Sequence, residues 1–275
     1  MRTTSRTATV LVLAAMAAAP LLTPASAFAE EEPEKPSATL AVSALSQYVW
    51  RGWIFSRHSV VVQPSLTVGY KGFGMNLWGN MDTDRYDSDP TTPDPQDNAS
   101  DWNETDLTLS YDGSYGMLNY GVGYIYYGLD IVSSDDTQEL YVKLGLDTLL
   151  SPTLTIYRDI DLIPGWYVTL GVSHSFPLTD TISLDLGARA GYYNSDDDAF
   201  TKVNSTDEFS CLHDGVLSAA LTIPVGEIFT VSPQVAWSFA LSNTASDRLE
   251  ADNLTNFQDD ESSIVYGGVT VSMAF

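Results

Sequence analysis

The sequence predicts an all-β fold, a transmembrane, antiparallel, up-and-down β-barrel of about 12 strands. The first observation is a period-two alternation of apolar and polar side chains that recurs along most of the chain. The second is that short turns, rich in Gly, Pro and Asp, alternate along the chain with long acidic loops. The third is a final strand that ends on an aromatic residue, Phe275.

The N-terminal residues 1–29 have the composition of a signal peptide. Arg2 and Arg6 give the positive start, and residues 8–22 form an apolar run. Small residues near Ala27 suit cleavage. The run is shorter than the roughly 20 residues of a spanning helix, so an uncleaved membrane anchor is the less favoured alternative. We therefore expect an exported protein.

After the signal peptide we expect a short leader and one domain. Residues 30–37 are acidic and contain prolines, which suits a solvated leader. Residues 38–275 would form a single barrel, a length within the usual range for one all-β domain. The expected strands are residues 39–49, 59–71, 73–82, 105–112, 116–127, 138–147, 153–159, 166–176, 181–193, 215–223, 228–240 and 263–275.

The alternation is clearest near the C-terminus. Between Phe229 and Phe239 every second residue is apolar, and the residues between them are small or polar. Helical spacing fits such a segment poorly. Pro64 and Pro233 stand inside expected strands, where each removes a backbone donor, which argues against the expected registers. A β-bulge at each proline would resolve this conflict. An even number of strands puts both chain ends on the periplasmic side.

The last residues favour a membrane barrel over a soluble β-sandwich, which would also alternate. Val271, Met273 and Phe275 share one face, and this pattern resembles the C-terminal assembly signal of outer-membrane barrels. An apolar edge strand would invite aggregation in water, and barrel closure removes that edge. We therefore expect a bacterial outer-membrane location and contact with outer-membrane lipid and lipopolysaccharide. We also expect recognition by the barrel assembly machinery through the strand that ends in Phe275.

Acidic residues give the chain a formal net charge of −24 and gather in the expected external loops. Nine lie in residues 82–106, six in residues 196–214 and six in residues 247–261. Such a surface disfavours nucleic acid as a partner and favours cations. Solvation of exposed loops explains the same pattern without any selectivity.

The acidic loops offer oxygen ligands but no metal motif. Asp196, Asp197 and Asp198 are consecutive, and residues 82–89 contain four aspartates, yet neither segment has EF-hand spacing. We expect weak divalent-cation binding there, bridging neighbouring lipopolysaccharide, and neither a specific metal site nor a cofactor.

The inner face of the expected barrel carries the candidate pore-lining residues. They are Asp106, Glu139, Lys143, Asp185, Arg189, Gln63, Asn76, Asn80 and Gln234. Their charges would bias which solutes enter a water-filled lumen. Alternatively, the charged residues brace the barrel. Glu139 and Lys143 lie four residues apart on one strand, too far to pair directly. Asp185 and Arg189 share that spacing, so both pairs would need partners on neighbouring strands.

Residues 47–52, Gln-Tyr-Val-Trp-Arg-Gly, resemble the aromatic-x-aromatic-Arg-Gly element of the TorF-like porin family of outer-membrane barrels. Further matches are Gln63-Pro64, the segment from Gly72 to Gly79, residues 149–161, Tyr167 and Ser173-His174-Ser175. Together they extend over most of the mature chain. The acidic segment near 83–104 and the long final loop depart from the family pattern. The resemblance implies a porin-like barrel.

Three functions remain open at this point. The leading prediction is a porin-like channel for passive diffusion of small hydrophilic solutes, with a cation bias from the acidic external loops. The second is a closed structural barrel filled by side chains and loops. The third is a lipid-modifying enzyme, for which Ser173-His174-Ser175 is the suggestive string. Neighbouring strand residues face opposite sides, and no G-x-S-x-G motif is present, so we expect no catalytic residue. Trp50 and Arg51 at the mouth would anchor the first loop.

Overall fold

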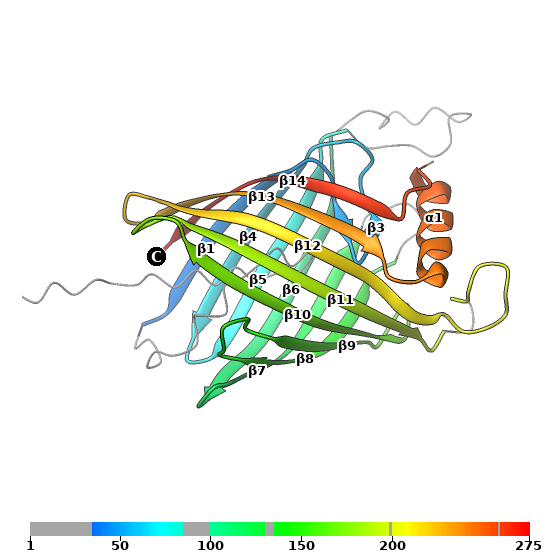
Figure 1. Cartoon of the computed structure of the whole chain (residues 1–275), viewed down its shortest axis with the longest axis horizontal. Helices are drawn as coiled ribbons and strands as arrows, with labels where there is room; N and C mark the ends of the chain where they lie inside the picture. Colours follow the sequence, from blue (N-terminus) through cyan, green and yellow to red (C-terminus); the bar gives the residue numbers. More distant parts are fainter. Residues whose placement is uncertain (1–34, 85–99, 130–134, 198–199, 258) are drawn as a thin grey trace, which may run out of the picture.

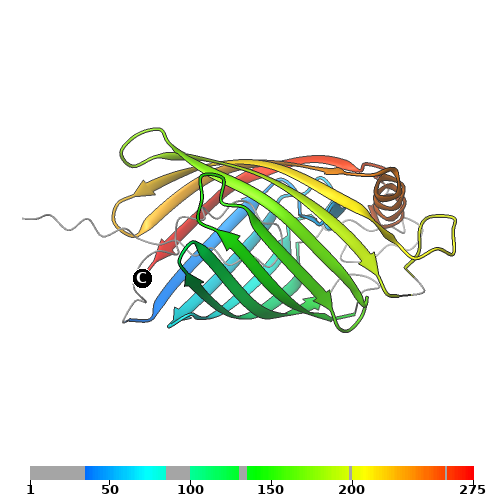
Figure 2. The ribbon, with the colours of Figure 1, turned by 60° about the horizontal axis from the view of Figure 1, so that its bottom comes forward.

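The fold is a closed antiparallel β-barrel, as the sequence predicts. The computed structural model describes residues 35–84, 100–129, 135–197, 200–257 and 259–275. The barrel strands in these ranges are β1 (Ser37–Leu45), β4 (Val61–Tyr70), β5 (Phe73–Asp82), β6 (Asp101–Tyr115), β7 (Leu118–Leu129), β8 (Thr137–Leu146), β9 (Thr153–Asp159), β10 (Gly165–Pro177), β11 (Ser183–Ser195), β12 (Ser210–Val225), β13 (Phe229–Ala240) and β14 (Ser263–Ala274). They are hydrogen-bonded in sequence order, and β1 closes the ring by pairing with both β4 and β14 (Figure 1, Figure 2).

Several predicted features lie outside the described residues. They are the signal peptide at residues 1–29, all but the end of the leader at 30–37, and the aspartates Asp87, Asp89 and Asp198 of the acidic loops. Nothing in the structure therefore bears on them.

Three strands differ by more than two residues at one end or both from those that the alternation predicts. The first ends at Leu45 instead of residue 49, because the chain then turns into the barrel. There it forms a short hairpin of β2 (Val49–Trp50) and β3 (Trp53–Ile54). β6 and β12 are longer than predicted, since their loop-side ends continue to pair with β5 and β11.

The two strand prolines are accommodated without a β-bulge at either position. Pro64 keeps its pairing with β1, while the ladder to β5 is interrupted there and resumes in the same register. Pro233 keeps its pairing with β14, and the ladder to β12 is interrupted in the same way. Each proline therefore loses its ladder to one neighbouring strand only, and the expected registers need no bulge there. The register shifts lie instead in the pairs β5–β6 and β11–β12.

Side chains of opposite character occupy the two faces of the barrel. Those that point outward are mainly Leu, Val and aromatic residues, and they are exposed, as at Leu40, Leu77 and Val142. Those that point inward are mainly Ser, Thr, Asn, Gly and charged residues. The closed sheet satisfies backbone groups internally, and its apolar exterior suits lipid contact.

Short turns and long loops lie at opposite ends of the barrel. The C-terminus lies at one end, and the helix α1 (Asn243–Phe257) lies at the other (Figure 1). The helix occupies a segment that we predicted as a loop, residues 241–262. It begins after Ser242, whose Oγ accepts a hydrogen bond from the Ala245 backbone N–H at 3.2 Å. In the described part of the chain, no helix combines the length and apolar character needed to cross a membrane.

Candidate functional site, a plug in the barrel lumen

The first long loop folds into the barrel instead of extending into solvent. We call its residues 46–60 the plug. Its hairpin turns at Arg51 and Gly52, whose φ angles of 50° and 87° lie in the left-handed region that glycine adopts readily. A hydrogen bond from the Phe55 backbone N–H to the Tyr48 carbonyl, 2.8 Å long, closes the hairpin.

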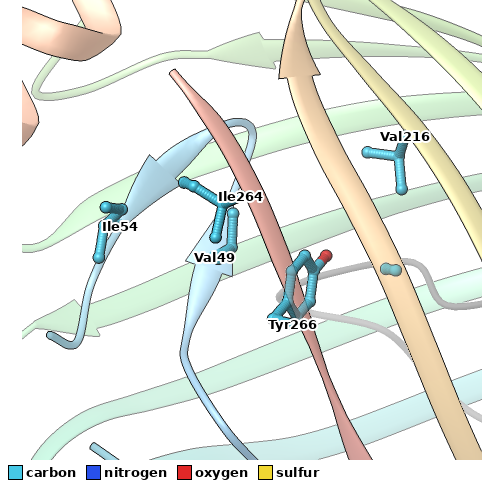
Figure 3. Packing of buried hydrophobic residues seen from close by; sticks show 6 residues of the cluster. Val49, Ile54, Val216, Ile264 and Tyr266 are labelled. Atoms are coloured by element: carbon cyan, nitrogen blue, oxygen red, sulfur yellow. The ribbon is translucent and has the colours of Figure 1, made fainter. Parts of the chain in front are cut away.

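The apolar side of the plug packs on the inner wall of β12 to β14. Val49 and Ile54 are almost fully buried and form one cluster with Val216, Ile264 and Tyr266 (Figure 3). Burial of an aliphatic side chain of this size contributes about 1.5–3 kcal/mol. The plug is therefore a packed part of the barrel interior.

A second group of plug side chains packs toward β4 and β5. Tyr48 lies against Leu45, Val61 and Trp78, and the Tyr48 and Trp78 ring centroids are 5.7 Å apart. Phe55 meets the Tyr48 ring edge-on at 5.2 Å. These contacts therefore hold the hairpin against β1, β4 and β5, beside the strands that it connects.

Arg51 crosses the lumen and binds the opposite wall. Its guanidinium donates two hydrogen bonds to the Glu139 carboxylate of β8, at 2.8 and 2.7 Å. Tyr127 Oη donates a third to the same carboxylate at 2.9 Å. The two charged side chains are 6 % and 3 % exposed. In the ring of strands β8 lies across from β1, so this pair joins opposite sides of the barrel through the plug.

Aromatic rings enclose the Arg51 guanidinium. Its Cζ lies 4.2 Å from the ring centroids of both Trp50 and Tyr167, and 5.0 Å from that of Tyr157. His213 Nε2 donates a hydrogen bond of 2.9 Å to the Arg51 carbonyl. Burial alone would lower the pKa of Arg51. The groups around it, chiefly the Glu139 carboxylate, instead hold that pKa above its ordinary value, so the guanidinium stays charged.

Helix α1 holds the external side of the plug through hydrogen bonds. Trp53 Nε1 donates to Asp252 at 3.0 Å, and the Ile54 backbone N–H donates to Asn253 Oδ1 at 3.1 Å. The buried Asn253 amide also donates to the Glu261 carbonyl at 2.8 Å. Asn253 thus ties the plug to the helix and to the segment that follows it.

Apolar contacts support the same junction. Leu249 of α1 is fully buried, and a Cβ built on Gly52 of the plug would lie 3.0 Å from its Cδ1. Ala245 of α1, also fully buried, joins a cluster with Tyr193 of β11 and with Phe209, which directly precedes β12. The helix therefore packs on both the plug and the barrel wall.

Two acidic residues of β6, Glu104 and Asp106, lie beside the plug at Tyr48. Both carboxyl groups are buried, and in the described part of the chain no basic residue pairs with either. Burial raises the pKa of Tyr48, and the neighbouring carboxyl groups raise that pKa further. The Tyr48 hydroxyl therefore remains protonated and available as a donor.

The nine predicted pore-lining side chains lie on the inner face of the barrel, and four of the five charged ones, all but Asp106, have partners on other elements. Besides the pair of Arg51 described above, Lys143 Nζ lies 2.9 Å from Asp112 Oδ1 on β6. Arg189 lies 2.6 Å from Asp214 on β12. Asp185 accepts a hydrogen bond of 2.7 Å from a threonine of β12.

The neutral members of the set form polar contacts along the wall. Gln63 donates to Asn80 at 3.0 Å, and Asn80 donates to Asn103 at 2.7 Å. Asn76 donates to a threonine of β4 at 3.0 Å, and Gln234 donates to a threonine of β14 at 3.2 Å. These contacts give the amide N–H groups acceptors, and such groups would be costly to leave unpaired.

The two halves of the lumen differ in their access to solvent. Toward the loops the plug and aromatic rings fill the interior, and wall residues such as Asp106, Glu139 and Tyr167 are almost fully buried. Toward the turns the inner wall carries small polar residues that are only partly buried, such as Thr67 and Thr222. Solvent therefore reaches the polar inner wall on the turn side of the plug.

Sequence reasoning missed several members of this site. Glu104 lies just before the strand predicted at 105–112. Asp214 and His213 fall in a segment predicted as loop, where they carry no alternation signal. The signal that could have found the plug is the Trp50-Arg51-Gly52 turn, because a buried Arg requires a carboxylate partner.

Comparison with known proteins agrees with this architecture. No family model matches the chain, and no curated protein matches it. Among solved structures, the NanC porin is similar over 85% of this chain and 98% of its own, with a TM-score of 0.52 and 12% identity. More distant similarity extends to OmpT, an outer membrane protein of Vibrio cholerae, at TM-score 0.38 and 8% identity over 88% of this chain and 97% of that one. An anion-selective porin from Comamonas acidovorans has TM-score 0.35 and 8% identity over 89% and 100%.

The chain has the fold of an outer-membrane porin. Its likeness to NanC, at this identity, concerns the fold alone. Together with the apolar exterior and polar interior, a closed barrel of this type places the protein in the bacterial outer membrane, in contact with membrane lipid.

Proposed function

We propose that the protein is a porin-like channel through which small hydrophilic solutes diffuse passively across the outer membrane. The observation that carries the proposal is the polar inner wall of the turn-side half, which solvent reaches. Polar wall groups and pore width decide which solutes enter such a lumen. Lys143 and Asp185, two of the nine residues predicted to line the pore, belong to that wall, and the role of all nine in transport is part of the proposal.

We further propose that the channel prefers cations. The basic residues Arg51, Arg189 and Lys143 are each bound to a carboxylate. The acidic residue Asp185 faces the lumen without a basic partner in the described part of the chain. The acidic external loops, with weakly bound divalent cations, would add to this negative field.

Conductance in a planar bilayer tests both statements. The refolded protein would be added to one side of a membrane under a KCl gradient. Discrete current steps with a cation-directed reversal potential support the proposal. A folded, heat-modifiable protein that shows no steps in the wild type or with the plug released would rule out an open channel.

A closed structural barrel is the second candidate, and the packed plug favours it. The buried Arg51–Glu139 pair spans the lumen, and removal of one partner would leave an uncompensated charge. The two candidates differ in one respect: a channel must have a state in which the plug leaves the lumen.

Other predictions gain no supporting contact. For the lipid-modifying enzyme, Ser173 and Ser175 fall on the inner face, while His174 faces outward, with its Nδ1 2.6 Å from the Leu149 carbonyl. Membership of the TorF-like family, binding of lipopolysaccharide and recognition of the Phe275 strand by the assembly machinery stay predictions.

A further inference from the structure

We propose that the plug and helix α1 form one closing unit, latched to the barrel wall by the Arg51–Glu139 pair, and that this unit leaves the lumen as a whole. One consequence of this inference, that conductance requires the unit to leave the lumen, rests on the proposed channel function. The movement of the unit can be measured separately.

Hydrogen bonds make the plug and the helix depend on each other. If the plug moved alone, the Ile54 backbone N–H would lose Asn253, and the Trp53 indole would lose Asp252. Asn253 is 1 % exposed, so its amide oxygen would be left without a donor away from water. An unsatisfied buried polar group is costly, which favours joint movement.

Packing leads to the same result. The Leu249 side chain lies against Gly52, at the tip of the plug hairpin. With the plug withdrawn and α1 in place, Leu249 would face an empty space. Because cavities lined by apolar side chains are unfavourable, the helix stabilises the plug in its inward position.

The latch lies at the far end of the plug from its attachment to the wall. Arg51 carries Trp50 with it, whereas Glu139, Tyr157 and Tyr167 belong to the barrel strands. A buried, bidentate pair is stable only while both charges are present and aligned. The Arg51–Glu139 pair is therefore either formed or broken, which gives the lumen one closed and one open state and no stable intermediate.

The test places a thiol probe on each part of the unit. The chain has a single cysteine, Cys211, so a Cys211→Ser background removes competing thiols. Ser56→Cys reports on the plug and Ala245→Cys on α1, and both native side chains are 0 % exposed. The rate of maleimide labelling of each folded variant then measures how often that part becomes exposed.

The latch is weakened by Glu139→Gln, which keeps the shape and removes the charge. Glu227→Gln, in the exposed turn between β12 and β13, is the matched control. The junction is weakened by Leu249→Ala, and Leu254→Ala, on the exposed side of α1, is its control. Heat-modifiability confirms that each variant has folded before it is labelled.

We expect Glu139→Gln to raise the labelling rate of both probes by about tenfold or more, because roughly 1.4 kcal/mol corresponds to that factor. Leu249→Ala should raise the rate at the plug probe as well, and neither control should do so. The open probability in planar bilayers should rise in parallel with the labelling rates.

Three results would count against these ideas in different ways. Faster labelling of Ser56→Cys with unchanged Ala245→Cys would show that the plug moves alone, and the single unit would be disproved. Unchanged labelling of both probes in Glu139→Gln would disprove the latch. Faster labelling of both probes without any current would support the closing unit and overturn the proposed channel.

Discussion

Lys143 of β8 reaches across β7 to Asp112 of β6, with its Nζ 2.9 Å from Asp112 Oδ1. Gly121 of β7 stands between them. A Cβ at Gly121 would lie 2.5 Å from Asp112 Oδ1 and 3.2 Å from Lys143 Cε. The absence of a side chain on the intervening strand therefore decides which carboxylate Lys143 meets.

This geometry predicts that Gly121→Ala destabilises the barrel, although alanine in a strand is ordinarily preferred to glycine. The new methyl group must displace the ion pair, so we expect the free energy of unfolding to fall by about 1 kcal/mol. The urea midpoint of the refolded barrel measures it.

Gly145→Ala is the matched control, because the nearest atom to its new Cβ is at an ordinary 3.5 Å. This variant should be neutral or slightly stabilised. Equal midpoints for both variants would show that the pair across Gly121 contributes nothing measurable.

Arg51→Lys should destabilise the folded barrel by about 2–4 kcal/mol, although the charge is conserved. Lysine cannot donate two parallel hydrogen bonds to Glu139 or lie flat between Trp50 and Tyr167. Urea unfolding gives the change in free energy. Arg158→Lys is the control, since Arg158 pairs with Asp196 at the partly exposed rim and should lose little. Equal losses at the two positions would contradict the special role of the buried pair.

Opposite changes in ion selectivity are expected from two inner-wall residues. Asp185→Asn removes an unpaired negative charge and should lower the cation-to-anion permeability ratio. Lys143→Gln leaves Asp112 without its cation and should raise the ratio. The reversal potential under a KCl gradient measures both. Shifts of the same sign would exclude these charges as the source of selectivity.

Deletion of Phe275 should impair assembly in cells more than folding in detergent. In the structure the Phe275 backbone N–H donates to Ala38 at 2.9 Å, which is one of many closing hydrogen bonds, while its ring is exposed. We expect refolding in vitro to keep its yield and the amount of heat-modifiable barrel in the outer membrane to drop several-fold. A Leu150→Ala variant, in the exposed turn between β8 and β9, controls for loss of an apolar side chain. A parallel loss in detergent would assign Phe275 a structural role only.

The barrel was predictable because its signal is local. The alternation from Phe229 to Phe239 indicates which side chains point into the barrel and which point outward, and the structure confirms this for β13. Inward placement of Glu139, Lys143, Asp185 and Arg189 follows from the same period of two. Local alternation does not indicate which residues pair with each other inside the barrel. The partners of Glu139, Lys143 and Arg189, which are Arg51, Asp112 and Asp214, were therefore not predicted.

The helix α1 and the plug were outside the reach of such patterns. Residues 243–257 contain polar and acidic residues without an apolar stripe typical of a packed helix, so the segment was predicted as a loop. Its inner face is built from a few residues, Ala245, Leu249 and Asn253, whose burial depends on the plug beneath them.

The sequence by itself determined the barrel, its strand number, the two faces of its wall and the acidic character of its loops. These properties depend on the order of side chains along each strand and on the chemistry of lipid and water on either side. Only the tertiary structure decided that the first loop turns inward, that Arg51 finds Glu139 and that α1 covers the plug. Those contacts join segments far apart in the chain, and their free energy depends on shape and burial that exist only after the barrel has closed.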